Sequence, residues 1–134
     1  MKKTIGRTDK ADFPGLGFND VPVKIDTGAY TSSMHCIYSK KENGLLKCRF
    51  FEKDEPETVF EKFDQTKVKS SNGLIERRYK IKTTIILFNK AYKINLTLTS
   101  REKMKYPVLI GRQFLNKKFV IDPGVTNLSF KNKN

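Results

Sequence analysis

The sequence lacks tryptophan, has one histidine and two cysteines, and contains no long apolar run. A membrane-spanning helix needs about 18 or more consecutive apolar residues, so none is expected. Cys36 and Cys48 are too few for a disulfide framework, which favours two reduced thiols over a bridge. The N-terminal residues are charged and no apolar segment follows them, so no signal peptide is expected. We therefore expect a cytoplasmic protein.

Acidic residues are also scarce. The chain has 27 Lys and Arg against 14 Asp and Glu, which gives a net charge of +13. Such an excess attracts polyanions, either nucleic acid, an anionic membrane or an acidic peptide. A lysine-rich soluble surface explains the charge equally well, so charge alone does not decide between them. With 134 residues and 37% hydrophobic residues, the chain is long enough to bury a core, and we expect one domain over residues 1–134.

Metal and phosphate motifs are missing as well. There is no Cys-x-x-Cys pair, no His-Glu-x-x-His pair and no glycine-rich phosphate loop. The adjacent residues His35 and Cys36 would point to opposite faces of a strand, so they would not share a metal. The sequence therefore predicts no metal and no cofactor, and a structural hydrogen-bonding role for His35.

What the sequence does contain is a series of short β-prone segments separated by turn residues. Asn43-Gly44 is a strong hairpin signal, and Ser71-Asn72-Gly73 is a second turn. Residues 59–68 fit either a strand or an irregular segment, and residues 112–116 fit one or two helical turns. The pattern predicts an all-β barrel or sandwich. The expected strands are 4–7, 21–26, 31–38, 45–51, 75–88, 91–99, 108–110, 119–121 and 127–130.

The candidate chemistry lies in Asp26-Thr27-Gly28-Ala29, directly after an apolar strand. Glycine allows a tight turn, and the Thr27 hydroxyl can hydrogen-bond locally and fix the loop. The small Ala29 leaves room for a substrate, and Asp26 is held at one point.

Two such carboxylates brought close together share one proton. One then activates water while the other protonates the substrate carbonyl. Because the chain carries one such motif, the second carboxylate has to come from a second copy, and we predict a homodimer.

A second segment sharpens this interpretation. Residues 108–115, Val-Leu-Ile-Gly-Arg-Gln-Phe-Leu, resemble the segment that precedes the C-terminal helix of retropepsins, and the turn at Asn72-Gly73 falls where their flap hairpin lies. The resemblance implies a closed retropepsin-like barrel with a flap hairpin and one short C-terminal helix. It also implies that Asp26, Thr27 and Gly28 form the catalytic motif and that Arg112 is structural.

The resemblance extends to a bacterial retropepsin-like family known as ATP-dependent zinc proteases. It is carried by Ile5-Gly6-Arg7, by Lys24 through His35, by Glu76-Arg77-Arg78, and by Leu96 through Arg112. Some members are encoded beside ATP-grasp ligases that add glutamates to protein tails. The resemblance therefore implies a glutamate-tail peptidase with an ATP-grasp ligase as partner. The residues support neither the zinc nor the ATP of the family name.

Basic residues near Asp26 indicate an acidic substrate. Strand alternation places Lys24 on the face of Asp26, where retropepsins usually have an apolar residue. Arg77 and Arg78 follow the flap turn, and only one of them can point inward. Arg101, Lys103 and Lys105 precede the Gly111 strand. The predicted substrate-binding set is Lys24, Ala29, Thr31, Ser33, Arg77, Arg78, Lys105 and Leu109.

These cations would lower the pKa of the paired carboxylates and favour the doubly ionised, inactive form. A bound acidic peptide would offset this effect, so we expect an aspartic endopeptidase that depends on glutamate-rich substrate. One alternative is a non-catalytic basic module that binds RNA or acidic tails, although no aromatic platform for RNA is evident. The other alternative is a zinc hydrolase.

Overall fold

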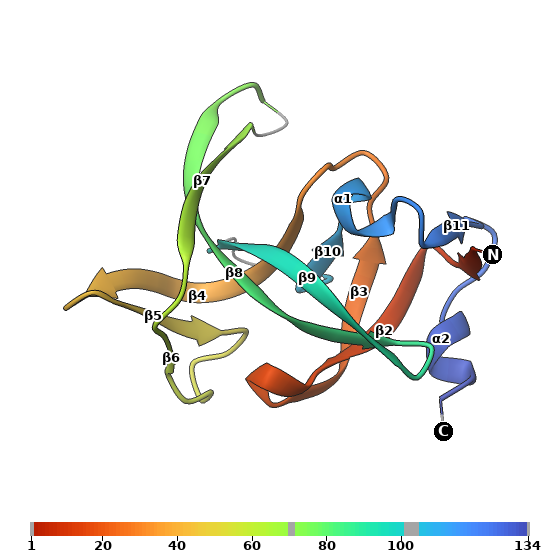
Figure 1. Ribbon diagram of the computed structural model, residues 1–134, viewed down its shortest axis with the longest axis horizontal. Helices are drawn as coiled ribbons and strands as arrows, with labels where there is room; N and C mark the ends of the chain where they lie inside the picture. The colour runs from red at the N-terminus through yellow and green to blue at the C-terminus, as the bar shows by residue number, and fades with distance from the viewer. Residues whose placement is uncertain (1, 70–71, 101–104, 134) are drawn as a thin grey trace.

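The computed structural model describes residues 2–69, 72–100 and 105–133, and most of them lie in short strands (Figure 1). Within these ranges six strands form a closed ring, in which β10 pairs with both β3 and β4. The β10–β3 and β9–β4 pairs are parallel and the other four are antiparallel. The ring runs β10 (Val108–Ile110), β3 (Phe18–Ile25), β2 (Thr8–Phe13), β8 (Ile75–Leu87), β9 (Lys90–Thr99) and β4 (Ser32–Glu42). The predicted all-β, retropepsin-like barrel is confirmed.

Alternation along the strands builds the core. In β3, Val23 and Ile25 are buried whereas Pro22 and Lys24 are exposed. Their neighbours Val108 and Ile110 in β10 are fully buried. One apolar face of each strand therefore lines the barrel interior, which holds the sheet in register because a one-residue slip would expose that face.

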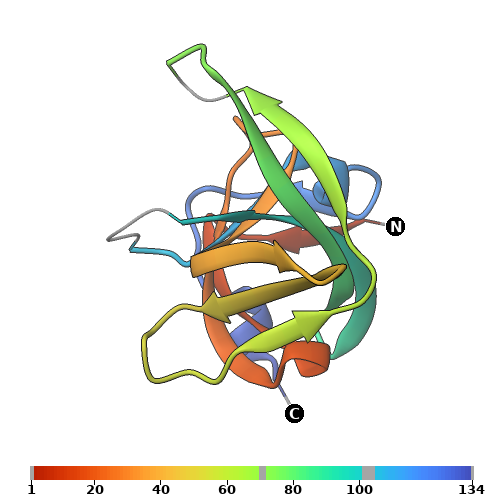
Figure 2. The ribbon, with the colours of Figure 1, turned by 90° about the vertical axis from the view of Figure 1, so that its left-hand side faces the viewer.

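A long hairpin and a small sheet extend the barrel. β7 (Asp64–Lys69) pairs with the first half of β8, and this flap hairpin projects from the barrel (Figures 1 and 2). β5 (Leu45–Phe50) pairs with β4 on one side and with β6 (Thr58–Phe60) on the other. The turn between β4 and β5 is the predicted Asn43-Gly44, and both residues have positive φ. Residues 59–68, left open by the sequence, thus divide between β6 and β7.

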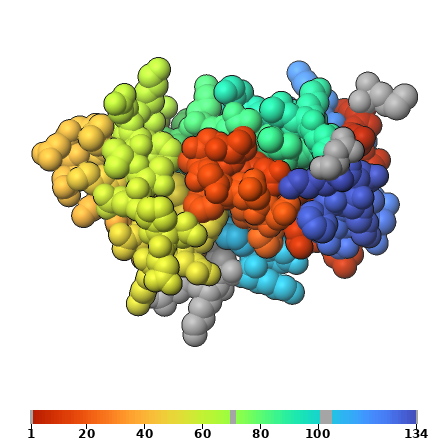
Figure 3. Space-filling view, turned by 90° about the horizontal axis from the view of Figure 1, so that it is seen from below, coloured from red at the N-terminus to blue at the C-terminus, as the bar shows by residue number. Residues whose placement is uncertain are grey.

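The two termini close the opposite side of the molecule. β1 (Lys3–Ile5) pairs in parallel with β11 (Phe119–Ile121). Helix α1 (Arg112–Leu115) precedes β11, and helix α2 (Leu128–Lys131) follows it. Figure 3 shows the C-terminal segment, in dark blue, against the orange N-terminal strands. Both helices have four residues, and no helix of the described ranges is long and apolar enough to cross a membrane.

Asp9 fixes the C-terminal segment to the barrel. Its carboxylate is 1% exposed and accepts hydrogen bonds from the backbone N–H groups of Ser129, Phe130 and Lys10, at 2.9, 3.1 and 2.8 Å. Ser129 Oγ in turn accepts the N–H of Phe88 at 2.7 Å. The first turn of α2 therefore obtains its hydrogen-bond acceptor from a distant strand.

Several predictions about individual elements were wrong. Residues 127–130 form α2 instead of a final strand, because Asp9 satisfies the N–H groups at the start of a helical turn. The strand expected at 4–7 is β1, which ends at Ile5. Strand β2, with the charged sequence Thr-Asp-Lys-Ala-Asp-Phe, was not expected. The strands expected at 75–88 and 91–99 are β8 and β9, and the turn between them is formed by Phe88 and Asn89, which both have positive φ.

Candidate active site

Asp26 lies at the end of β3, in a loop that is hydrogen-bonded to its surroundings. Its backbone N–H donates to the carbonyl of Ile110 at 2.8 Å, and its own carbonyl accepts the N–H of Ala29 at 3.2 Å. The N–H of Gly28 donates to Asp26 Oδ1 at 3.1 Å. A β-carbon at Gly28 would lie 3.3 Å from that oxygen. The half-buried carboxylate therefore has one backbone donor within its own loop.

The segment around Gly111 is hydrogen-bonded to the residues that follow Asp26. The backbone N–H groups of Arg112 and Gln113 donate to the carbonyls of Ala29 and Tyr30, each at 2.9 Å. A β-carbon at Gly111 would lie within 2.6 Å of two backbone oxygens, which explains why glycine is required there. The structure thus joins the two motifs that the sequence singled out.

Arg112 has the structural role that was expected. Its guanidinium donates from Nη1 to the carbonyl of Thr27 at 2.8 Å and lies 5.8 Å from the centre of the Tyr30 ring. Thr27 and Gly28 are exposed, and Ala29 and Thr31 are half-buried. The arginine therefore holds the backbone of the Asp26 loop without contacting the carboxylate in this chain.

Strand pairing brings three predicted substrate residues into one row. Lys24 on β3 pairs with Leu109 on β10, which pairs with Ser33 on β4. The row continues through two residues that the sequence analysis missed, Thr97 on β9 and Lys80 on β8. Paired residues share a face of the sheet. This face is the outer one, because the intervening residues Val23, Met34 and Leu96 are buried in the core.

The exposed fractions along this row differ. Lys24 is exposed and Leu109 half-buried, whereas Ser33 and Thr97 are 7% and 1% exposed. Alternation in β8 could have signalled Lys80, because it precedes the buried Ile81. Alternation also places Thr97 on the opposite face from Leu96 and Leu98, but it does not reveal the pairing with Ser33 that adds Thr97 to the row.

The exposed fractions of Arg77 and Arg78 show which of these two flap residues points inward. Arg77 is exposed, whereas the side chain of Arg78 is only 9% exposed and its Nη2 lies 3.2 Å from Glu76 Oε2. Lys105 is exposed, with its Nζ 5.7 Å from the centre of the Tyr106 ring. Arg101 and Lys103 lie outside the described residues, as does Ser71 of the flap turn.

Among the described residues, no group of three or more His, Cys, Asp or Glu side chains could hold a metal ion. Cys36 and Cys48 are free thiols that belong to the core, and neither is exposed. Burial raises the pKa of Cys36 to about 11 and that of Cys48 to about 12. The described residues therefore offer no group of ligands that fits the zinc in the family name.

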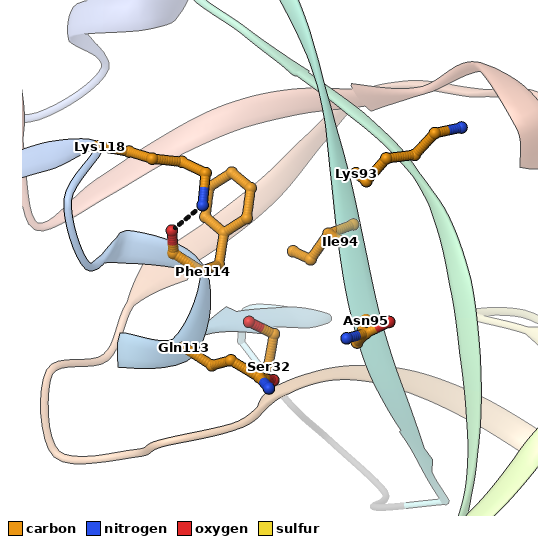
Figure 4. A pocket seen from close by; sticks show the side chains of 7 residues that line it. All are labelled: Ser32, Lys93, Ile94, Asn95, Gln113, Phe114 and Lys118. Carbon is orange, nitrogen blue, oxygen red and sulfur yellow. Dashed lines mark hydrogen bonds between the residues drawn. The ribbon is translucent and has the colours of Figure 1, made fainter.

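A small pocket lies beside α1, and its lining includes none of the predicted site residues (Figure 4). Phe114 and Lys118 lie on one side of it and the β9 residues Lys93, Ile94 and Asn95 on the other. Lys118 Nζ donates to the carbonyl of Phe114 at 2.8 Å and lies over the ring of that residue. Ser32 and Gln113 complete the lining, and Asp26 is not part of it.

The sequence and the structure are similar to those of known proteins. Residues 4–132 match the RimB-like family, described as retropepsin-like aspartic endopeptidase RimB. A protein named "Probable alpha-L-glutamate ligase" from Shewanella halifaxensis is 33% identical over 139 residues, and one of the same name from Desulfotalea psychrophila is 30% identical over 142. These matches cover 91% and 92% of this chain but 29% of each relative, so the chain spans less than a third of their length.

A solved structure shares the fold. A Legionella pneumophila protein of unknown function, assigned to DUF785, superimposes with a TM-score of 0.73 at 25% sequence identity. The match covers 96% of this chain and 99% of that one. Together with the family match over nearly the whole sequence, this similarity shows that the chain belongs to the RimB-like family of retropepsin-like aspartic endopeptidases.

Proposed function

We propose that the protein is a homodimeric aspartic endopeptidase in which Asp26 of each copy supplies one carboxylate of the catalytic pair. The observation that carries this proposal is the single Asp-Thr-Gly loop, held by hydrogen bonds to the Gly111 segment, in a chain of a retropepsin-like family. One loop presents one carboxylate, and two-fold symmetry supplies the second from the same position.

The mechanism follows from the pair. Two carboxylates held close together share one proton and titrate as a unit. The ionised Asp26 takes a proton from a water molecule, which attacks the peptide carbonyl, while the protonated Asp26 donates its proton to the carbonyl oxygen. The Gly28 N–H, 3.1 Å from Oδ1, and the Arg112 contact to Thr27 keep both carboxylates in position.

Exposed apolar side chains support the dimer. Tyr30, next to the Asp26 loop, is 54% exposed, and Leu74 and Ile75 near the flap turn are 67% and 70% exposed. A second copy of the chain that covered these side chains would remove them from water. Large apolar groups that are exposed together are typical of association surfaces.

The proposed substrate is an acidic, glutamate-rich peptide such as an α-linked polyglutamate tail. Lys24 is exposed on the row that also holds Leu109 and Ser33, and Ala29, Thr31, Arg77, Arg78 and Lys105 complete the proposed binding set. A net charge of +13 raises the local concentration of such a substrate. We also propose that the protein acts in the cytoplasm.

The named relatives support the link to glutamate. Proteins called alpha-L-glutamate ligases contain a region similar to nearly the whole of this chain, within a sequence more than three times as long as the matched part. A peptidase region joined to such a ligase suggests that both work on the same glutamate-containing product. We therefore propose a glutamate ligase of the ATP-grasp class as a functional partner.

Incubation with α-linked oligoglutamate, followed by mass spectrometry, tests this function. The wild-type protein is expected to shorten the peptide, and Asp26→Asn is expected to leave it intact while remaining a folded dimer. Cleavage that survives Asp26→Asn would contradict the aspartic mechanism. Binding without cleavage by either protein, weakened steeply by salt, would favour a non-catalytic basic module.

A further inference from the structure

Three buried side-chain nitrogen atoms lack a hydrogen-bond partner among the described residues, and two of them are on strands of the barrel ring. These two are His35 Nδ1 on β4 and Arg78 Nε on the flap strand β8. The Arg78 nitrogen carries a hydrogen atom that can only be donated. Leaving a buried donor of a charged group unpaired costs free energy, so such a group in a native protein calls for an explanation.

Strand register relates these two residues through Thr99 of β9. His35 pairs with Thr99 at the end of β9. On the other side of β9, the last pair with β8 is Lys80 with Thr97. The β8–β9 pairing ends at this pair, and β8 continues into the flap hairpin, where Arg78 pairs with Thr66 of β7. An antiparallel register continued by two residues would set Arg78 opposite Thr99, so that Arg78 and His35 belong to the strands on either side of Thr99.

This trio lies beside the row that includes Lys24 and Leu109. Each of its members is two residues from the row formed by Lys80, Thr97 and Ser33, so the two rows occupy one outer face of the barrel. Thr99 is 6% exposed and the Arg78 side chain 9% exposed, so the groups are shielded from bulk water. Their hydrogen bonds would accordingly be stronger than those on an open surface.

The present partner of Arg78 indicates what the position accepts. Glu76, two residues earlier on the same strand, contacts Arg78 through Oε2 at 3.2 Å, and its side chain is 54% exposed. The guanidinium thus binds one carboxylate through Nη2 while Nε remains unpaired. A carboxylate that reached Nε and Nη2 together would make the two-point contact for which a guanidinium is suited.

We propose that Arg78 and His35 form a carboxylate pocket that selects an acidic side chain of the substrate. This proposal rests on the proposed function and deepens it. The substrate carboxylate accepts hydrogen bonds from Arg78 Nε and from His35 Nδ1, and it takes the place of Glu76 at the guanidinium. Arg77 is exposed on the opposite face of β8 and is not part of this pocket.

The test compares a glutamate-rich peptide with an isosteric glutamine-rich peptide, using binding to the Asp26→Asn dimer measured by calorimetry. The Asp26→Asn protein is expected to prefer the glutamate peptide. Adding Arg78→Gln or His35→Gln is expected to weaken binding of that peptide about tenfold or more, and to leave the glutamine peptide unchanged. In the active enzyme, the same substitutions are expected to raise KM for the glutamate peptide more than they lower kcat.

Two further variants separate this pocket from a general effect of charge. Arg49 also has a buried Nε without a partner among the described residues, but it lies on β5 against the ring of Tyr38. Arg49→Gln is therefore the matched control, and it is expected to keep the preference. Glu76→Gln removes the competing carboxylate, and it is expected to tighten binding of the glutamate peptide several-fold.

The outcomes are distinct from those of the function test. Equal losses for both peptides in Arg78→Gln and His35→Gln would overturn the pocket even if Asp26 proves catalytic. A loss of preference in Arg49→Gln as large as that in Arg78→Gln would also overturn it. If Arg78→Gln does not fold, His35→Gln and Glu76→Gln test the pocket instead. An unchanged preference for the glutamate peptide in both variants would reject the proposal.

Discussion

Asp9 and Gly6 contact the C-terminal residues 125–130, and we call this contact the terminal clamp. The terminal clamp and the Asp26 loop each contain one aspartate, and the two carboxylates differ in exposure and in the number of hydrogen bonds that they accept. Asp9 is 1% exposed and accepts three backbone N–H groups from Lys10, Ser129 and Phe130. Asp26 is half-buried and accepts one N–H, from Gly28 in its own loop. A carboxylate whose acceptor sites are filled stabilises the fold, whereas one with free acceptor sites can take part in chemistry.

The largest expected effect comes from Asp26→Asn. We expect cleavage of acidic peptide to fall by about 10³-fold or more, because the pair loses the group that activates water. The free energy of unfolding should change by about 0.5 kcal/mol or less, because the side chain is partly solvated. Single-turnover cleavage and urea unfolding measure the two quantities. A large loss of stability would make Asp26 resemble Asp9 and would remove the contrast between the two regions.

Asp9→Asn is expected to lower the stability of the protein and to leave its catalytic rate unchanged. The amide group would meet a backbone N–H where the carboxylate oxygen accepted one, so α2 should detach at a cost of about 3 kcal/mol. Urea unfolding measures this loss, and hydrogen exchange at Ser129 and Phe130 locates it. The kcat of the protein that remains folded should match that of the wild type. A specific loss of kcat without a loss of stability would show that the clamp also acts on the active site.

Two glycines sharpen the comparison. A β-carbon at Gly6 would overlap the carbonyl of Val125 in the clamp, and one at Gly111 would lie 2.5 Å from the Thr31 carbonyl oxygen beneath the Asp26 loop. Each Gly→Ala change should cost about 2 kcal/mol, because backbone atoms must move. When kcat is measured on the protein that remains folded, only Gly111→Ala should lower it. Equal kcat in both variants would mean that the Asp26 loop tolerates displacement.

The smallest expected effect is the pH dependence of stability that the core thiols produce. Burial raises the pKa of Cys36 to about 11 and that of Cys48 to about 12, from an ordinary value of 9.0. The native protein then keeps protons that the unfolded chain releases, so stability is complete below about pH 9 and falls as pH rises toward 11. Thermal unfolding between pH 8 and 11 measures the slope. Cys48→Ala should unfold at lower temperature at pH 8 but show a shallower slope, and an unchanged slope would assign the effect to other groups.

Local patterns were sufficient for part of the site. Asn43-Gly44 predicted its hairpin turn, because each of the two positions needs positive φ. Alternation predicted that Lys24 lies on the face of Asp26, and the structure leaves Lys24 exposed between the buried residues Val23 and Ile25. The Asp-Thr-Gly loop and the Gly111 segment were recognised by their residue types, and the structure joins them through backbone hydrogen bonds. These features depend on neighbouring residues, which a sequence displays directly.

Other features depend on residues far apart in the chain. The propensities of residues 127–130 favour a strand, but Asp9, 120 positions from Ser129, caps a helical turn there. The residues Thr97 and Lys80 join the row of Lys24 only through strand register. The sequence likewise left open which of Arg77 and Arg78 is buried, because two adjacent residues of a strand always face opposite ways.

By itself, then, the sequence determined the strand-and-turn alternation, the single Asp26 motif and the excess of positive charge, since all three are properties of short segments or of composition. Only the tertiary structure decided that Asp9 is a structural carboxylate, that Arg78 rather than Arg77 is shielded from water, and that His35 pairs with Thr99. The physical reason is that burial and hydrogen-bond satisfaction arise when strands pair, and pairing joins residues that the chain keeps apart.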